Sequence, residues 1–297
     1  MKFICMGSSV YDMTFVVDGE FREDGKKRAK DYVECGGGNG ANYAYTLASW
    51  ENDVDLISIV GNDLFGEALL KEYSEIGINK DLIEVRDNFT TPKSVIISNR
   101  NNSTRTIVTT SREVIRKLDV QIKDNGNIIL LDGNYIDTAK ELLDKNRNAT
   151  IIFDIERNDP EIIELAKRAN YIICSKDFAE EFTGIDLSNI NDNLVSCYDK
   201  LSECFSNSQL IITLGKDGAF TKTTSYKLIK SIKVNAIDTT GSGDVFHAAF
   251  AHFLSKGYDL ESILKYSSIA AALSTTKVGC RNKVPKLEEV LNYNDII

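Results

Sequence analysis

The sequence is poor in proline, tryptophan and histidine, and it lacks a long hydrophobic run. Of its 297 residues, only 3 are proline, 1 is tryptophan and 2 are histidine. No stretch approaches the ~18 apolar residues of a membrane-spanning helix, and the apolar run near Met1 is too short for the core of a signal peptide. The 42% hydrophobic and 27% charged residues are typical of a globular protein. We therefore expect neither a disordered nor a fibrous protein, and no membrane partner.

The sequence also lacks a Cys-x-x-Cys pair. Its 6 cysteines are scattered along a chain that is long enough to bury a large core without disulfides. This usage predicts reduced thiols and a cytoplasmic location. His247 and His252 are five residues apart, without a cysteine or acidic residue at ligand spacing, so we expect core histidines rather than a structural metal site.

Basic residues are also fewer than acidic residues. The chain has 35 Lys and Arg against 44 Asp and Glu, which gives a net charge of -9. This balance repels a phosphate backbone and argues against nucleic acid as a partner. An anionic ligand must then be held locally, by backbone N–H groups, a helix N-terminus or a few cations. Glycine-rich turns are therefore the segments to examine.

Apolar runs of strand length alternate with amphipathic stretches of helical period along most of the chain. The alternation predicts an α/β fold with three layers, α/β/α, around a central and mainly parallel sheet. The runs are 3–6, 55–60, 127–131, 150–154, 171–174 and 209–214, and the helical stretches include 42–50, 66–76, 137–146 and 160–169.

Two parts of the chain instead show the period of two that is typical of antiparallel strands. The alternation predicts that residues 14–17 pair with 29–35 and that residues 93–99 pair with 104–110. A polar turn that suits a hairpin joins the second pair. We expect a small antiparallel sheet at the edge of the α/β body. It would be formed by segments at about 13–36 and 90–111 within a single domain over residues 1–297.

The segment 238–244 reads Asp-Thr-Thr-Gly-Ser-Gly-Asp and precedes an apolar stretch, 245–254, that predicts a buried helix. Glycines before a helix let the backbone approach a ligand, and the helix N-terminus attracts phosphate. Asp244 lies at the same helix start and is able to accept a proton from a hydroxyl, as phosphoryl transfer requires. The alternative is that Asp244 merely caps the helix while Gly241 and Gly243 form a tight turn.

A second glycine-rich segment, 36–42, lies between a strand-like run and a helix. Gly36, Gly38 and Ala41 match a dinucleotide-binding fingerprint, so a Rossmann dehydrogenase is one alternative. A buried Rossmann strand is apolar, whereas residues 26–34 are dense in charge and indicate an exposed strand. A glycine turn that only permits close helix packing is the other alternative.

Two more strand ends carry polar or glycine residues. Asp12 follows the first strand, where ligands of open α/β sheets bind, and the segment 213–218 repeats the arrangement later in the chain. Taken alone, either segment also fits an ordinary turn.

Together, segments 37–42 and 238–244 resemble the two signature motifs of the ribokinase-like carbohydrate kinases, the PfkB family. The resemblance extends over nearly the whole chain and includes 7–12, 213–218 and 270–280, the last being similar to the adenine-side helix and loop of the family. It implies the ribokinase-like fold and ATP-dependent phosphorylation of a sugar.

The resemblance also implies roles for particular residues. Asp244 is the expected catalytic base, and the backbone N–H groups of the three residues before it form the expected anion hole. An unphosphorylated pentose or hexose is favoured because Asn39 stands where members acting on phosphorylated sugars commonly have lysine. The residues concerned are Gly241, Ser242 and Gly243 for the anion hole, Asp12, Gly38, Asn39 and Asn42 for the sugar, and Thr213, Gly215, Gly218 and Gly279 for the nucleotide.

Cofactors and assembly follow from the same resemblance. We expect Mg²⁺ with ATP, and a potassium ion beside the anion hole at Asp238 and Thr240, close to Gly279. The small antiparallel sheet would close over the sugar as a lid and exclude water, and it would be the contact surface of a homodimer.

One segment departs from the family pattern. Where the family has Asn-x-x-Glu, this chain has Ser175 and Phe178, and a phenyl ring cannot organise a magnesium water shell. Asp177, Glu180 or Glu181 would then substitute, or the use of magnesium would be altered, or catalysis would be weak. A catalytically impaired sensor of sugar or nucleotide is therefore one alternative. A nucleoside kinase of the same family is another, because Tyr11, Phe15 and Tyr43 near the lid would be able to stack on a base.

Overall fold

The apolar runs form the strands of a large central sheet. In a computed structural model that describes all residues except 21, 102–103, 111–112 and 294–297, every predicted run coincides with a strand to within one residue at either end of the run or lies inside it. The strands of this sheet are β1 (Lys2–Met6), β4 (Asp53–Gly61), β5 (Ile83–Arg86), β8 (Ile128–Leu131), β9 (Thr150–Ile155), β10 (Tyr171–Ser175), β11 (Gln209–Thr213), β12 (Ala219–Lys222) and β13 (Tyr226–Ile229).

The central sheet is mainly parallel, as predicted. Its order is β13-β12-β11-β10-β9-β8-β1-β4-β5, and the pairs from β11 to β5 are parallel. Only β12 and β13 run antiparallel to their neighbours. The carboxyl ends of the parallel strands therefore meet along one edge, where α/β proteins bind ligands.

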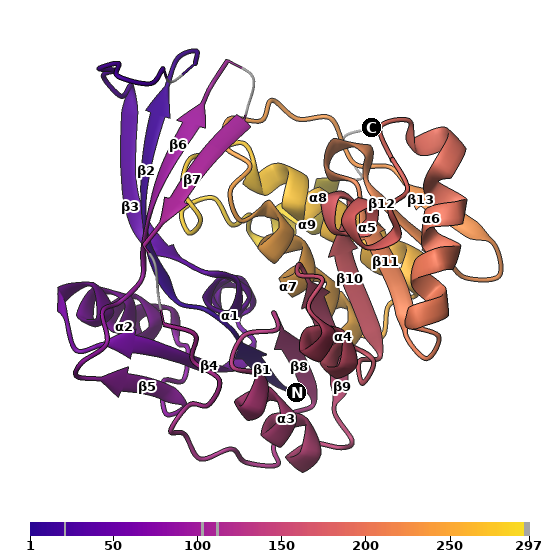
Figure 1. Ribbon diagram of the computed structural model, residues 1–297, viewed down its shortest axis with the longest axis horizontal. Coiled ribbons are helices and arrows are strands. Elements are labelled where there is room, and N and C mark those ends of the chain that lie inside the picture. The colour runs from indigo at the N-terminus through magenta and orange to yellow at the C-terminus, as the bar shows by residue number, and fades with distance from the viewer. Residues whose placement is uncertain (21, 102–103, 111–112, 294–297) are drawn as a thin grey trace.

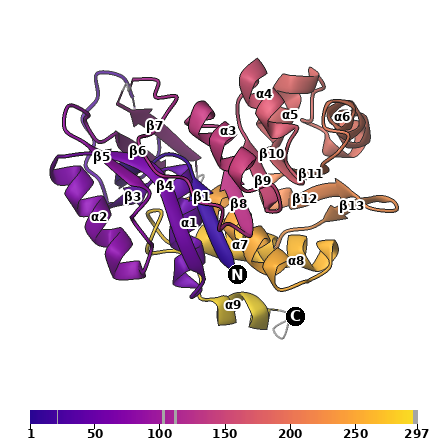
Figure 2. The same ribbon diagram turned by 90° about the horizontal axis from the view of Figure 1, so that it is seen from below.

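Helices cover both faces of this sheet (Figures 1 and 2). Alternate residues of β1 enter two different cores: Ile4 and Met6 pack with α3 to α6, whereas Phe3 and Cys5 pack with the other helices. This is the predicted three-layer arrangement, because a strand covered on both faces is apolar throughout. The helices are α1 (Asn39–Ser49), α2 (Leu64–Ile76), α3 (Ile136–Lys145), α4 (Pro160–Ala166), α5 (Lys176–Thr183), α6 (Ile190–Cys204), α7 (Ser242–Ser255), α8 (Leu260–Ser274) and α9 (Leu287–Leu291).

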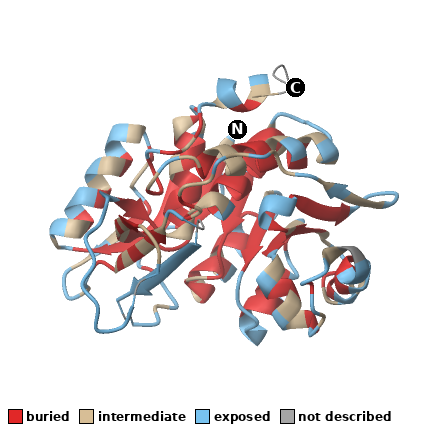
Figure 3. Ribbon diagram, turned by 90° about the horizontal axis from the view of Figure 1, so that it is seen from above, coloured by how far each residue is buried: buried red, intermediate tan, exposed pale blue. Residues whose placement is uncertain are grey.

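A smaller sheet projects from the edge of the α/β body (Figure 1). It consists of β2 (Val10–Val17), β3 (Asp31–Gly37), β6 (Lys93–Asn99) and β7 (Thr104–Thr109), in the order β3-β2-β6-β7. The β2–β3 and β6–β7 pairs are antiparallel, as predicted, and a parallel β2–β6 pairing joins them. Every residue of β7 is exposed, and Figure 3 shows burial concentrated in the central sheet and the helices on it.

The place of β3 corrects one interpretation of the sequence. A dinucleotide fingerprint requires the strand before the glycines to lie in a parallel βαβ unit. Instead, β3 belongs to the smaller sheet, is largely exposed over residues 31–34 and pairs antiparallel with β2. The Rossmann interpretation is therefore wrong, and the charged residues before Gly36 are explained by exposure. Of the described helices, none is long and apolar enough to cross a membrane.

Candidate active site

The two glycine-rich segments meet at the carboxyl edge of the central sheet. Helix α1 begins inside the early segment, at Asn39, and packs against α7, which begins inside the late segment. Asn42 of α1 donates a hydrogen bond from Nδ2 to Oδ2 of Asp244 on α7 at 2.5 Å, and both side chains are buried. The structure thus joins a predicted sugar-binding residue to the predicted base, although 202 positions separate them.

The start of α7 is built by its two glycines. Gly241 is the N-cap residue with a φ of 72°, a conformation that glycine adopts without strain. Because no side chain caps this helix, Asp244 is not its N-cap residue. A Cβ atom added at Gly243 would meet nothing within 4 Å, so this turn faces open space. Ser242 N, one of the predicted anion-hole donors, donates to Thr239 O at 3.3 Å.

Burial sets the proton affinity of Asp244. Desolvation raises the pKa of this carboxyl to about 7, against the opposing effect of the Asn42 hydrogen bond, and nearby Asp154 contributes further. A carboxylate with a pKa near neutrality is suited to general-base catalysis.

A buried polar cluster that sequence reasoning did not identify surrounds Asp244. Tyr43 donates its hydroxyl to Asp154 Oδ2 at 2.5 Å, and His247 Nε2 lies 3.3 Å from Asp154 Oδ1. Burial alone would lower the pKa of His247, but Asp154 outweighs it and the pKa rises to about 9. Beside this cluster, the exposed Glu156, which is hydrogen-bonded to Asn39, has its pKa raised to about 8, chiefly by Asp154.

Both histidines are buried, as predicted. His247 Nδ1 donates to Gly243 O at 2.7 Å and thereby holds the first turn of α7. No cluster of metal-ligating side chains is found in the part of the chain that the structure describes.

The predicted sugar-binding carboxylate, Asp12, faces the early glycine segment. A Cβ atom at Gly37 would lie 1.9 Å from Asp12 Oδ2, and one at Gly38, whose φ is 87°, would lie 2.4 Å from the carbonyl oxygen of Ser8. Only glycine permits this approach. Burial raises the pKa of Asp12 to about 6, although hydrogen bonds from Cys280 and Ser94 oppose the shift.

The predicted nucleotide residues lie in different surroundings. Thr213 ends β11, and Gly215, which follows in a 3₁₀ turn, has open space where a Cβ atom would be. A Cβ atom at Gly218 would clash with Ile229 O at 1.9 Å, so this glycine is required by the β12–β13 hairpin. Gly279 instead donates from its N–H to Asp238 Oδ2 at 3.0 Å.

The predicted potassium site contains an ammonium group. Asp238 is fully buried, and its carboxylate accepts hydrogen bonds from Thr240 and Gly279. Lys283 Nζ donates to the carbonyl oxygen of Asp238 at 3.0 Å. Because a cation of the protein already contacts Asp238, these residues do not fit the expected potassium ion.

The departure from the family pattern is a packing feature. Phe178 is buried, with its ring centroid 5.7 Å from that of Phe182, and Ser175 caps α5 by accepting from Phe178 N. Of the three possible substitutes, Glu180 accepts from Leu187 N at 2.6 Å, whereas Asp177 and Glu181 are exposed.

The smaller sheet reaches the late glycine segment through an arginine that sequence reasoning missed. Arg105 of β7 donates from Nη1 to the Thr239 hydroxyl at 2.7 Å. Thr239 O in turn accepts from both the N–H and the hydroxyl of Ser242. The outer strand of the smaller sheet is thus linked to the loop that begins α7.

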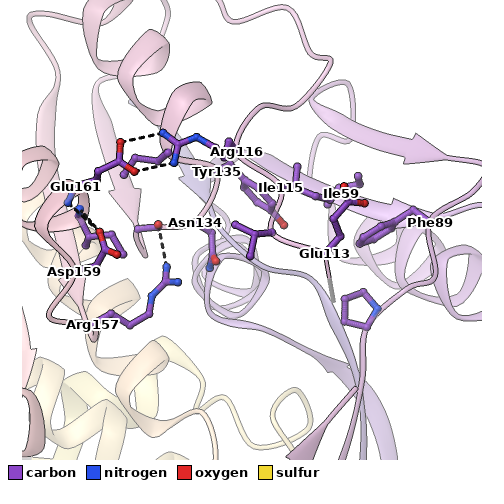
Figure 4. A pocket seen from close by; sticks show the side chains of 15 residues that line it. Ile59, Phe89, Glu113, Ile115, Arg116, Asn134, Tyr135, Arg157, Asp159 and Glu161 are labelled. Carbon is purple, nitrogen blue, oxygen red and sulfur yellow. Dashed lines mark hydrogen bonds and ion pairs between the residues drawn. The ribbon is translucent and has the colours of Figure 1, made fainter. Parts of the chain in front are cut away.

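A cavity lies beside this edge, at the ends of β8 and β9 (Figure 4). Arg157 is one of the residues that line it and donates to Gly133 O at 3.0 Å, while Arg116 is held by Glu161 and Asp137. None of the predicted site residues lines it, but Arg157 directly follows Glu156, which lies beside the buried cluster.

Comparisons with known proteins agree with this arrangement. Residues 1–287 match the pfkB family carbohydrate kinase domain. The deoxyribokinase of Salmonella typhi is 24% identical over 305 residues, covering 99% of this chain and 98% of the relative. The ribokinase of Cryptococcus neoformans in complex with ADP superposes with a TM-score of 0.83 at 20% identity, over 98% of this chain and 99% of that one. The ribokinase of Arabidopsis thaliana complexed with ribose and ATP gives 0.80 at 20% identity, over 98% and 97%.

The chain therefore belongs to the pfkB family of carbohydrate kinases. Its central sheet with helices on both faces and its small projecting sheet are those of the ribokinase-like fold, as the resemblance of the motifs implied.

Proposed function

We propose that this protein transfers a phosphoryl group from ATP to a hydroxymethyl group of a small unphosphorylated sugar, a pentose or a hexose. The observation that carries the proposal is the buried contact between Asn42 and Asp244 beside the open glycine turn at the start of α7. A base next to a helix N-terminus supplies the two things that phosphoryl transfer needs, an activated hydroxyl and an environment for anionic charge.

In this mechanism Asp244 accepts the proton of the attacking hydroxyl. The backbone N–H groups of Gly241, Ser242 and Gly243 stabilise the charge on the transferring group, and the start of α7 adds its dipole. The sugar hydroxyls bind to residues of the early segment and of the first strand of the smaller sheet, namely Asp12, Gly38, Asn39 and Asn42.

ATP enters as its magnesium complex. Thr213, Gly215, Gly218 and Gly279 are the proposed nucleotide residues, of which Gly215 has open space around its α-carbon. The Arabidopsis relative is described as complexed with ribose and ATP, which supports the pairing of a sugar with this nucleotide. The smaller sheet is the proposed lid, because Arg105 connects it to the loop before α7.

Two other functions remain as alternatives to test. A nucleoside kinase would use the same base and anion hole with a larger acceptor. A sensor that binds sugar without transferring phosphate would leave the buried base without a role, and the retained contact between Asn42 and Asp244 argues against it.

The decisive experiment is release of ADP from MgATP by the purified protein over a panel of free sugars and nucleosides. Sugar-dependent ADP formation would support the proposal, and formation with nucleosides alone would favour the nucleoside kinase. Thermal stabilisation by sugars without any ADP would favour the sensor.

We expect Arg105→Ala to lower kcat/KM for ATP by about 10-fold or more, because the variant removes a charged hydrogen bond to Thr239. The matched control is Arg100→Ala, which removes an exposed ion pair with Asp18 at the same sheet. Steady-state kinetics at saturating sugar would measure both. Equal rates for the two variants would contradict a role for Arg105.

We also propose a homodimer through the smaller sheet, whose outer strand exposes Ile107 and Val108. Light scattering after gel filtration should give twice the chain mass of 33.1 kDa. Val108→Lys should give monomers, whereas Val114→Lys, at an exposed position outside this sheet, should not change the mass. A wild-type monomer would refute the proposal.

A further inference from the structure

Lys283 is a fully buried cation that contacts Asp238, in the loop that leads into the proposed anion hole. Its side chain and that of Asp238 have no exposed surface, and Nζ lies 3.7 Å from Asp238 Oδ2 as well as 3.0 Å from the carbonyl oxygen of the same residue. Burial of an ammonium group is costly unless it is paired and hydrogen-bonded. A cation kept at this position must therefore be compensated by the loop it contacts.

Asp238 is the residue around which that loop is organised. One carboxylate oxygen accepts from the N–H of Thr240 at 3.0 Å and from its hydroxyl at 2.7 Å, and the other accepts from Gly279 N at 3.0 Å. Its N–H donates to Thr275 O at 3.1 Å. The buried carboxylate needs a positive charge nearby, and Lys283 provides it.

Lys283 is also held in place from its own side. Two residues further along, the carbonyl oxygen of Pro285 accepts from Trp50 Nε1 at 2.8 Å, and Trp50 is itself buried against His252 and Phe253. The segment that carries the ammonium group is thus fixed to the core. The charge does not depend on a diffusible ion.

We propose that the ammonium group of Lys283 takes the place of a monovalent metal ion beside the anion hole and positions the loop 238–241, so that this protein works without potassium. The inference rests on the proposed kinase function only for its activity readout. Lys283 is a positioning residue, since its contact is with Asp238 and not with a substrate.

The first test uses the wild-type protein in potassium, sodium and choline chloride at matched ionic strength. ADP formation should be the same in all three, and the thermal unfolding midpoint should not distinguish potassium from sodium. An activation by potassium of about 5-fold or more, which is the scale of a real coupling, would overturn the proposal. So would a higher unfolding midpoint in potassium than in sodium.

The second test compares Lys283→Ser with Lys283→Met. The serine variant opens space beside Asp238, and it should lose about 10-fold or more of its activity in sodium and recover it in potassium or ammonium. Its unfolding midpoint should also be roughly 2–4 °C higher in potassium than in sodium. The methionine variant keeps the volume without the charge and should not respond to either ion.

The outcomes separate this inference from the proposed function. If no sugar yields ADP, the thermal data of the wild type and of Lys283→Ser still decide the cation question. A folded serine variant that no cation restores, or a fully active methionine variant, would overturn the role of Lys283. If the serine variant does not fold, the wild-type comparison alone decides.

Discussion

Asp244→Asn is expected to lower kcat by ~10²–10⁴-fold or more, the usual contribution of a general base. The amide retains the size of the side chain and remains able to hydrogen-bond with Asn42, so sugar affinity should change little. Steady-state ADP release gives kcat, and sugar binding by calorimetry gives the affinity. A variant with wild-type turnover would refute the assignment of the base.

The stability of this variant provides a control. Burial raises the pKa of Asp244 from the ordinary 3.8 to about 7, so the ionised carboxylate destabilises the folded state increasingly as pH rises from about 4 to 7. Above that range the neutral amide removes this cost. Asp244→Asn should therefore unfold at the same temperature as the wild type or higher, and loss of activity cannot be attributed to unfolding.

The same pKa predicts the pH dependence of the wild type. A general base is active when deprotonated, so kcat/KM should fall as pH decreases below about 7 and level off above it. A profile without an acidic limb between pH 5 and 8 would show that the essential ionisation belongs to a group other than Asp244. Circular dichroism over the same range would verify that the protein stays folded.

Gly243→Val is expected to reduce kcat by ~10²–10³-fold, comparable to the loss of one oxyanion-hole donor. At its Cβ position the added side chain would meet no atom within 4 Å apart from its chain neighbours and the backbone of its own helix, so it would enter the space proposed for the transferring phosphoryl group. The fold should tolerate it, because valine is no worse than glycine inside a helix. Kinetics and thermal unfolding together measure both effects.

Gly243→Ala is a smaller substitution at the same position and serves as a comparison for Gly243→Val. Its single methyl group should reduce kcat less than valine does, while the unfolding temperature stays level or rises. Gly241→Ala should behave in the opposite way, with lower stability, because the φ of 72° at this position is strained for alanine. Full activity of Gly243→Val would show that the turn does not face the transferred group.

The fold was largely predictable from the sequence because the central strands are covered on both faces. A strand such as β9 must then be apolar at successive positions, and its pattern is visible without any partner. The parallel pairing of β2 with β6 was not predictable, since it joins residues about 80 positions apart and leaves no local pattern. The two antiparallel pairs of the smaller sheet were predictable because their partners are close in sequence.

The motifs identified Asp244, Asn42 and the glycines, whose backbone requirements leave recognisable spacing. They did not identify Asp154 or His247, because a buried polar pair on two elements has no characteristic local sequence. Lys283 and Arg105 were missed for the same reason, since each acts through one long-range contact. The segment around Lys283 also contains Arg281 and Asn282, so its local sequence did not single out a buried lysine.

The β2–β6 pairing makes the two halves of the smaller sheet depend on each other in evolution. The smaller sheet is assembled from two segments that enter the chain at separate points, between β1 and α1 and between β5 and β8. A two-stranded hairpin alone is only marginally stable in water, so neither segment supports itself without the other. If one of the two segments were deleted, the other would lose the strand with which it pairs. We therefore expect related chains to carry both segments or neither.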